Sequence, residues 1–223
     1  MVNLENQQRL FEDIGKRLKK RTECFVIGGS AMLYYGAKAV TKDIDVVFDD
    51  KECFDNFLKI LKEIEFKVKD PEALYFGKEN KPALMERGSE RVDIFYKEII
   101  TFKLSESMVG RIKMVYEYNN LIANVVSPED IILLKSATER AGDRADALEL
   151  IKRFNVNWSI ITKEAINQTE LDKPLFVVFL YEFLLELKED FKADIPDEVL
   201  KSLLKMSEKE MVKRLKKKGG FVK

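Results

Sequence analysis

Two adjacent glycines interrupt an apolar run near the start of the chain, and a pair of aspartates follows them on a second apolar run. The segment from Phe25 to Asp50 reads FVIGGSAMLYYGAKAVTKDIDVVFDD. AMLYYG has apolar residues at helical spacing, whereas DIDVVF alternates charged and apolar residues as a half-buried strand does. The segment therefore predicts a strand, a tight turn, a short helix and a second strand.

The glycine turn suits a phosphate group. Gly28 and Gly29 allow the backbone to turn sharply and to approach a ligand without a Cβ clash. A helix that starts after the turn presents free N–H groups, which attract anions. We place Ser30 at the N-cap, where its hydroxyl can cap the helix or bind a phosphate oxygen. The alternative is a plain turn with no ligand.

The aspartate pair suits a divalent cation. Asp43 and Asp45 are two residues apart, so on a strand both side chains project from one face. Two carboxylates so close repel each other unless positive charge lies between them. Mg²⁺ prefers carboxylate and phosphate oxygens, so a phosphate site beside this pair predicts binding of a nucleoside triphosphate with magnesium. The alternative is solvated surface at a strand end.

This segment resembles the signature of the DNA polymerase beta-like nucleotidyltransferase superfamily. The matching residues are Gly28-Gly29-Ser30 and Asp43-Ile44-Asp45. The small prokaryotic branch with abortive-infection toxin nucleotidyltransferases is the most similar, although Ala39 stands where that branch carries an arginine, with Lys38 beside it. The resemblance implies two Mg²⁺ ions, for which Mn²⁺ can substitute, and it implies that Asp43 and Asp45 bind both.

The resemblance also implies a third carboxylate on a neighbouring strand, and Asp93 is the best match. It lies in the alternating segment Arg91-Val92-Asp93-Ile94-Phe95-Tyr96. A buried aspartate on an apolar strand needs a metal or a basic partner, because burying an isolated charge is costly. The alternatives to a metal are an aspartate that faces the edge of the sheet and an ion pair with Arg91 or Arg87.

Composition excludes several kinds of chemistry. The 223 residues contain no histidine, which excludes Ser-His-Asp and Cys-His nucleophilic sites and makes the usual zinc sites implausible. Lys plus Arg equals Asp plus Glu at 39 each, so contact with nucleic acid requires local patches. Cys24 and Cys53 are expected to be free thiols. No signal peptide and no membrane-spanning run is evident, so we expect a cytoplasmic protein without membrane contact.

Periodicity predicts an α+β protein with a mixed sheet, flanking helices and a helical C-terminal region. We expect a catalytic core over residues 1–126 and the helical region over 127–223. Residues 3–21 form an amphipathic helix with a basic end, Asp49-Asp50 caps a helix to about Ile64, and 111–117 pairs with 121–126 as a hairpin. Ala73 to Phe76 is expected to extend or follow a strand. Ser127-Pro128 starts a helix that ends near Gly142, and DRADALELIKRF forms another.

Lys135 and Arg140 are further candidate nucleotide ligands by analogy with the toxin branch. In those relatives a helical lysine and a downstream Arg/Asp group face the phosphates, so Lys135 would neutralise charge while Arg140 and Asp143 organise the site. The alternative is local ion pairing along the helices, such as Arg140 with Asp143 or Glu139 with Arg144.

From about Asn155 the chain reads as helices, with starts at Pro174 and Pro196 and a buried helix from Pro174 to Leu187. The basic tail from Lys213 to Lys218, followed by Gly219-Gly220, is expected to be solvated, with nucleic-acid contact as the alternative. We therefore predict a magnesium-dependent nucleotidyltransferase that moves an NMP to a hydroxyl of RNA such as tRNA, of protein or of a small molecule. The alternatives are a non-catalytic nucleotide-binding or antitoxin-like module that binds a protein partner and a toxin that modifies tRNA or protein.

Overall fold

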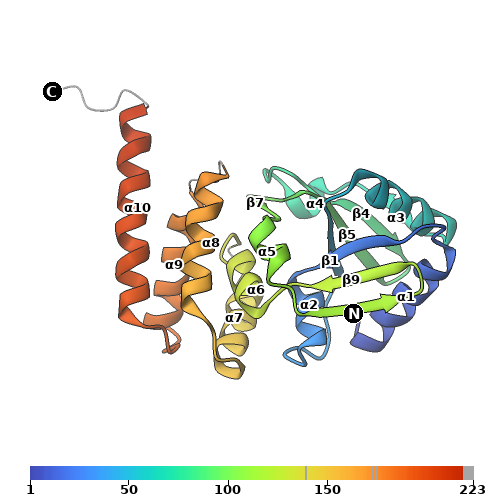
Figure 1. Cartoon of the computed structure of the whole chain (residues 1–223), viewed down its shortest axis with the longest axis horizontal. Helices are drawn as coiled ribbons and strands as arrows, with labels where there is room; N and C mark the ends of the chain where they lie inside the picture. Colours follow the sequence, from blue (N-terminus) through green and yellow to red (C-terminus); the bar gives the residue numbers. More distant parts are fainter. Residues whose placement is uncertain (139, 172, 174, 218–223) are drawn as a thin grey trace. The chain divides into compact units, whose positions relative to one another are not determined.

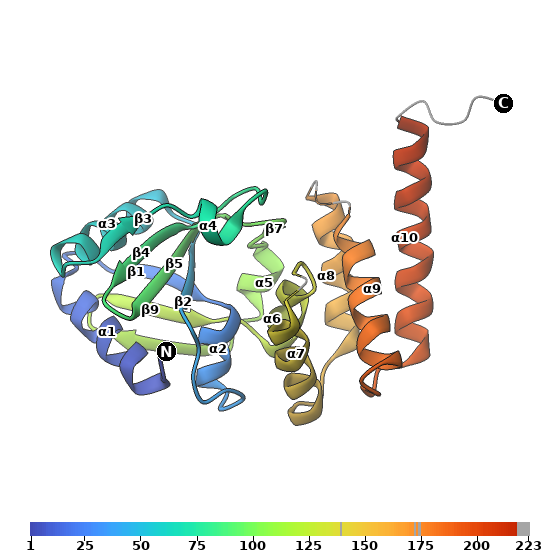
Figure 2. The same cartoon turned by 180° about the vertical axis from the view of Figure 1, so that it is seen from behind.

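The structure is a computed structural model that describes residues 1–138, 140–171, 173 and 175–217. It divides into two compact units, Met1–Ile131 and Ile132–Lys223. The first holds the sheet and the second is helical (Figures 1 and 2). The α+β fold class is confirmed. The division into a catalytic core over residues 1–126 and a helical region over residues 127–223 remains a prediction.

Nine strands in the described part of the first unit form one mixed sheet. The order along its main path is β3-β4-β5-β2-β1-β9-β8, and β6 pairs with β5 and β7. The pairs β1–β9 and β2–β5 are parallel, whereas the others are antiparallel. The strands are β1 (Thr22–Val26), β2 (Ile44–Phe48), β3 (Lys67–Lys69), β4 (Ala83–Arg87), β5 (Glu90–Tyr96), β6 (Glu98–Ile99), β7 (Phe102–Lys103), β8 (Met114–Tyr118) and β9 (Leu121–Val125).

The helices described in the first unit are α1 (Leu4–Arg17), α2 (Gly28–Tyr34), α3 (Lys51–Glu63), α4 (Glu72–Tyr75) and α5 (Glu106–Gly110). The predicted cap of α3 is confirmed, since Asp50 Oδ1 accepts a hydrogen bond from the Cys53 amide at 2.8 Å. The predicted hairpin is confirmed as β8 and β9, with Asn119 in the left-handed region at a φ of 56°.

One face of the central strands is covered by helices and the other carries the aspartates. Phe48 of β2 packs against Phe57 of α3, with 5.0 Å between the ring centroids. Ile44 and Val46 share this face with Phe48, because side chains alternate along a strand, and all three are buried. Asp45 therefore projects from the opposite face of β2, and Asp43, one residue before the strand, continues that alternation.

The second unit contains the helices α7 (Ala141–Arg153), α8 (Trp158–Glu170), α9 (Phe176–Glu189) and α10 (Asp197–Lys217), and α6 (Pro128–Lys135) crosses the boundary between the units. Ser127 caps α6 as predicted, accepting a hydrogen bond from the Asp130 amide at 3.2 Å. The predicted apolar helix is α9, which buries Phe176, Leu180 and Leu184. Pro174 and residues 218–223 of the tail lie outside the described residues.

Two predicted elements differ from the structure. Residues 73–76 follow β3 and do not extend it, because α4 covers most of them. The helix predicted from Ser127 to Gly142 ends at Lys135, and Gly142 lies in the first turn of α7 instead of ending a helix. Side-chain contacts explain this break, since Ser136 and Thr138 donate hydrogen bonds to the carbonyls of Leu133 and Lys135.

Within the described part of the chain, no helix combines the length and the apolar character needed to cross a membrane.

Candidate active site

The glycine turn lies directly against the aspartate pair. Gly28 has a φ of +59°, a conformation that residues with a side chain rarely adopt. A Cβ atom on Gly28 would lie 2.8 Å from Oδ2 of Asp45. Glycine at this position therefore lets the backbone turn and leaves room for the carboxylate.

Ser30 joins the turn to the strand that carries the aspartates. The Ser30 hydroxyl donates a hydrogen bond to the carbonyl of Asp43 at 3.1 Å and accepts one from the amide of Asp45 at 3.0 Å. Ser30 is fully buried. The predicted N-cap position is wrong, because α2 begins at Gly28 with Ile27 as its N-cap. In this structure the hydroxyl holds the backbone on both sides of Ile44, and its role as a phosphate ligand stays a prediction.

Four charged side chains lie together on the face of the sheet opposite α3. Asp45 of β2 pairs in register with Asp93 of β5. Asp43 and Arg91 precede these residues by two positions each, so all four side chains share one face. We call Asp43, Asp45, Arg91 and Asp93 the carboxylate face. The structure therefore brings together the three aspartates that the sequence selects.

Arg91 links two of these aspartates. Its guanidinium forms an ion pair with Asp43 and another with Asp93, the latter with 3.0 Å between Nε and Oδ1. Asp93 is fully buried and also accepts a hydrogen bond from the Tyr75 hydroxyl at 2.6 Å. The ion pair that the sequence offered as an alternative role for Asp93 is therefore present. Tyr75 was missed, because residues 73–76 were expected only to extend or follow a strand and no side chain among them was assigned to the site.

The donor set of the carboxylate face suits Mg²⁺ in its chemistry. Carboxylate oxygens are the side-chain ligands that this ion prefers, and the register places three of them on neighbouring strands. Arg91 shows that this face already holds a cation between Asp43 and Asp93. Among the described residues, however, no three Asp, Glu, Cys or His side chains are gathered closely enough to hold a metal ion. A bound ion would therefore require these carboxylates to move towards it.

Lys38 reaches the second glycine of the turn. A Cβ atom on Gly29 would lie 2.5 Å from Oγ1 of Thr41 and 3.8 Å from Nζ of Lys38. Gly29 therefore allows close packing of the turn against Thr41 and Lys38. The sequence singled out Lys38 only as the neighbour of Ala39, and the structure now places its ammonium group beside the candidate phosphate site.

Lys135 lies in a buried ion cluster of the second unit. Its ammonium group contacts Asp143 at 2.7 Å and Asp146 at 2.6 Å, and its side chain is 7% exposed. Arg140 also pairs with Asp143, at 3.0 Å, as the local alternative predicted. Glu139, the other residue of that alternative, lies outside the described residues, and Arg144 pairs with Glu186. Nucleotide binding by Lys135 and Arg140 stays a prediction.

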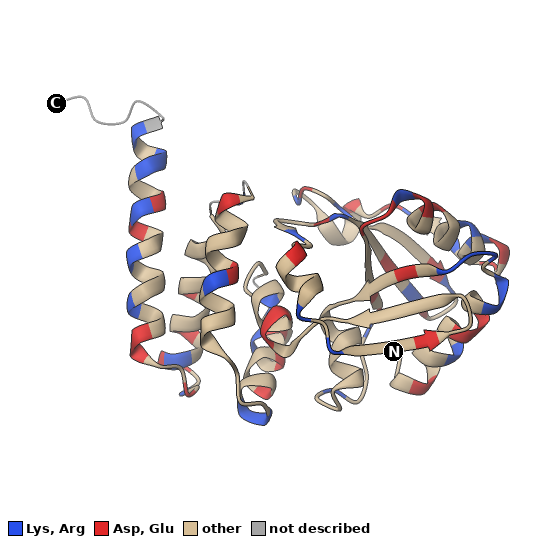
Figure 3. Ribbon diagram, in the orientation of Figure 1, with Lys and Arg blue, Asp and Glu red and all other residues tan. Residues whose placement is uncertain are grey.

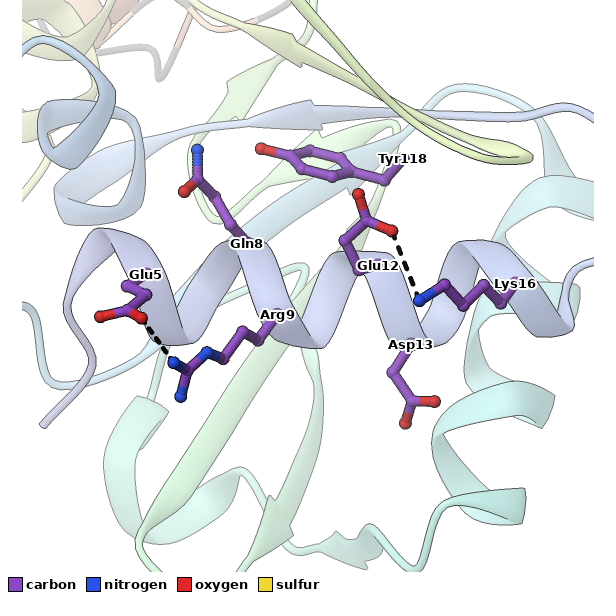
Figure 4. Close-up of a pocket in the computed structure, with 7 residues that line it drawn as sticks. All are labelled: Glu5, Gln8, Arg9, Glu12, Asp13, Lys16 and Tyr118. Carbon is purple, nitrogen blue, oxygen red and sulfur yellow. Dashed lines mark hydrogen bonds and ion pairs between the residues drawn. The ribbon is translucent and has the colours of Figure 1, made fainter.

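The surface hollow in Figure 4 is a poor candidate for the site. It lies along α1 beside Tyr118, and the other residues that line it are Glu5, Gln8, Arg9, Glu12, Asp13 and Lys16. Its charges neutralise one another, since Glu5 pairs with Arg9 and Glu12 with Lys16. Two cations that follow α1 are also paired, because Lys20 contacts Glu52 at 2.8 Å and Arg21 contacts Glu117 at 3.3 Å. This surface is a solvated helix face.

We expect Gly28→Ala to impair any activity of the carboxylate face more than it impairs folding. The new Cβ would press on the Asp45 carboxylate and would be strained at positive φ, a cost of about 1 to 2 kcal/mol in the free energy of unfolding. Gly88→Ala is a matched control, because Gly88 has a φ of +58° and nothing within 4 Å of an added Cβ. Urea unfolding and nucleotide binding are measured on both. Equal losses of nucleotide binding in the two variants would contradict the prediction.

The sheet, the glycine turn and the carboxylate face define a nucleotidyltransferase-like protein. A family model described as "Nucleotidyltransferase of unknown function (DUF6036)" matches residues 5–176, and the chain belongs to this family. A solved structure titled "Crystal structure of an antigenic nucleotidyltransferase-like protein from Paracoccidioides brasiliensis" is 16% identical, with a TM-score of 0.47, and the match covers 89% of this chain and 98% of that one. The search of curated proteins found no match.

Proposed function

We propose that this protein transfers a nucleotidyl group from a nucleoside triphosphate to an acceptor hydroxyl and releases pyrophosphate. The observation that carries the proposal is the register of Asp45 with Asp93, which sets three aspartates on one face beside the glycine turn. Membership of a family described as nucleotidyltransferases supports it. We infer that this reaction takes place in the cytoplasm and uses ordinary cellular nucleoside triphosphates.

The glycine turn and Lys38 would bind the triphosphate. Gly28 and Gly29 carry no side chains, so their backbone can approach phosphate oxygens closely. α2 has only seven residues, so we assign most of the positive charge at this site to the Lys38 ammonium group. Binding the β- and γ-phosphates here would leave the α-phosphorus open to in-line attack. Ser30 would keep this turn in place relative to Asp43 and Asp45 through its two backbone hydrogen bonds.

The three aspartates would hold magnesium, and Asp93 would accept the proton of the acceptor hydroxyl. When bound, the ions would neutralise charge on the phosphates and on the attacking and leaving oxygens. Arg91 and Tyr75 hold Asp93 in this structure, so its oxygens become available only as these two contacts loosen. Most of the acceleration would come from positioning and charge neutralisation, as is general for phosphoryl transfer.

The Arg91 contacts also favour a second function, a non-catalytic nucleotide-binding module. An arginine that permanently neutralises Asp43 and Asp93 would take the place of a metal. Such a module would bind a nucleotide through the glycine turn and would act through a protein partner. The two functions are distinguished by turnover, because the enzyme would convert the triphosphate and the module would only bind it.

The experiment incubates purified protein with each α-labelled nucleoside triphosphate, Mg²⁺ and total cellular RNA. The control is the Asp43→Ala/Asp45→Ala variant, because both side chains belong to the carboxylate face. Label on RNA or protein with the wild type alone would support transfer and would identify the base and the class of acceptor. If the protein binds the triphosphate but transfers no label to RNA, to protein or to added small hydroxyl compounds, the binding module is supported. If the wild type shows neither triphosphate binding nor label transfer, the proposed site is overturned.

Lys38→Ala is expected to raise the KM for the triphosphate about 10- to 100-fold, because one charge-assisted contact to phosphate is removed. Lys42→Ala is the matched control, since Lys42 is exposed in the same connection and has no contact with the glycine turn among those described. Both variants are compared in steady-state kinetics and in equilibrium binding. A KM for Lys38→Ala within twofold of the Lys42→Ala value would remove Lys38 from the site.

A further inference from the structure

α10 carries a row of lysines on the side that faces away from the other helices. It packs against α9 and α8, and its buried residues include Val199, Leu200 and Leu203. Lysines recur every fourth residue on the exposed side, and we call Lys201, Lys205, Lys209 and Lys213 the lysine ridge. Residues four apart on a helix lie on one face, so these four side chains are neighbours. Figure 3 shows the basic residues repeating along this helix.

The second half of the ridge borders a shallow hollow. It is lined by Lys205, Glu208, Lys209, Val212, Lys213 and Lys216. Four ammonium groups therefore surround the hollow together with one carboxylate. Such a surface favours a ligand with several negative charges.

The charges of the ridge are largely unneutralised within the described part of the chain. Lys213 has an ion pair with Glu210, at 3.7 Å, and Lys201 helps Lys188 to lower the pKa of Asp197, one turn away. Within the described part of the chain, Lys205 and Lys209 of the ridge, and Lys216 beside it, have no ion pair. On α1, by contrast, Arg9, Lys16 and Arg17 each pair with an acid one turn away. Like charges at four-residue spacing destabilise a helix, so the ridge is not explained by helix stability.

We propose that the lysine ridge binds the phosphate backbone of RNA and that RNA is the acceptor substrate of this protein. Four residues of a helix rise about 6 Å, so the ridge places a cation at regular steps along an extended polyanion. A polyanion that also offers hydroxyl groups is RNA, whose nucleotides each carry a 2′-hydroxyl. The choice of RNA as acceptor rests on the proposed function, whereas binding itself does not depend on catalysis.

A membrane surface fits the ridge less well. A helix that lies on a bilayer buries a continuous apolar face opposite its basic face. Among the described residues of α10, Leu203 is fully buried where the helix packs on α9, and the most exposed apolar residues, Leu204, Met211, Val212 and Leu215, are 38 to 46% exposed, so the helix has no fully exposed apolar face. The main attraction that the ridge offers is therefore that of its positive charges for negative charges, which favours the phosphate backbone of RNA over a membrane surface.

The test compares RNA binding by two triple variants of the full chain. Lys205→Gln/Lys209→Gln/Lys213→Gln removes the centre of the ridge. Lys59→Gln/Lys62→Gln/Lys67→Gln removes the same charge from exposed lysines of the first unit and is the matched control. Binding of a labelled, folded RNA of tRNA size is followed by fluorescence anisotropy at several salt concentrations, without nucleotide and with EDTA. Circular dichroism checks that both variants remain folded.

We expect the ridge variant to bind RNA about 10- to 100-fold more weakly than the wild type at 0.1 M salt, with a salt dependence lower by about two to three counterions. The control should bind within about threefold of the wild type. Asp43→Ala/Asp45→Ala protein should bind as the wild type does, so a failure of catalysis is distinguishable from a failure of the ridge. Equal losses in both triple variants, equal affinity for DNA of the same sequence, or tighter binding to vesicles of anionic lipid would overturn the proposal.

Discussion

Replacing Asp93 with asparagine is expected to lower the rate of nucleotidyl transfer by roughly 10³- to 10⁴-fold, the size of effect seen when a catalytic carboxylate is removed. The amide keeps the shape of the side chain and can still accept a hydrogen bond from Tyr75, whose hydroxyl lies 2.6 Å from the Asp93 carboxylate. Arg91 keeps its ion pair with Asp43. The variant should therefore fold, and kcat should fall far more than the affinity for the triphosphate.

Glu86→Gln is the matched control for Asp93→Asn. Glu86 lies on the neighbouring strand β4, opposite Arg91. It pairs with Lys69 at 3.6 Å on the surface, a contact that contributes little to stability. Label transfer by Glu86→Gln should stay within about threefold of the wild type. Transfer by Asp93→Asn at the wild-type rate would show that Asp93 is a structural partner of Arg91.

The same geometry explains how much of the site could be predicted from the sequence. Asp43, Asp45 and Asp93 were found because the period of a strand places i and i+2 on one face, and a charge within an apolar run stands out. Arg91 has that same spacing from Asp93, which is why its ion pair could be offered as an alternative. Tyr75 could not be found, since nothing in the local pattern brings α4 to Asp93 across residues 76–92.

The errors of the fold prediction have similar local causes. The helix expected to run on to Gly142 ends at Lys135, where Ser136 and Thr138 bond to backbone carbonyls in competition with the helix. Ser30 read as an N-cap because serine favours that position, but its hydroxyl bonds to the backbone of Asp43 and Asp45. In both cases the type of side chain indicated a hydrogen bond to the backbone, but the sequence did not show which backbone group accepts or donates it. That partner depends on the tertiary structure.

Lys135→Met is expected to lower the free energy of unfolding of the second unit by about 3 to 5 kcal/mol, because it leaves two carboxylates buried without their shared cation. Lys135 contacts both Asp143 and Asp146, at 2.7 and 2.6 Å, and all three side chains are at most 12% exposed. The chain has one tryptophan, Trp158 of α8, so its fluorescence reports unfolding of this unit during urea titration.

Lys51→Met is the control for that substitution, because it breaks an exposed pair, and its unfolding is followed by circular dichroism because Lys51 lies in the first unit. Lys51 contacts Asp55 at 2.7 Å, but both side chains are more than half exposed, so the loss should be below about 1 kcal/mol. The triple variant Lys135→Met/Asp143→Asn/Asp146→Asn should recover part of the stability lost in Lys135→Met, since no unpaired charge then remains buried. A loss below about 1 kcal/mol for Lys135→Met would contradict the assignment of the cluster as a buried ion network.

Acid should destabilise the second unit through the same cluster. Burial raises the pKa of Asp143, but the pairing with Lys135, Thr138 and Arg140 outweighs it and holds that pKa below its ordinary value of 3.8. A carboxyl whose pKa is lower in the folded state stabilises the protein above its unfolded-state pKa and loses that contribution as the pH falls through its folded-state pKa. Urea titrations read by Trp158 fluorescence should therefore show the stability of the wild type decreasing below about pH 4. Asp143→Asn should lack that part of the decrease, and an unchanged acid dependence in this variant would show that other carboxyl groups cause it.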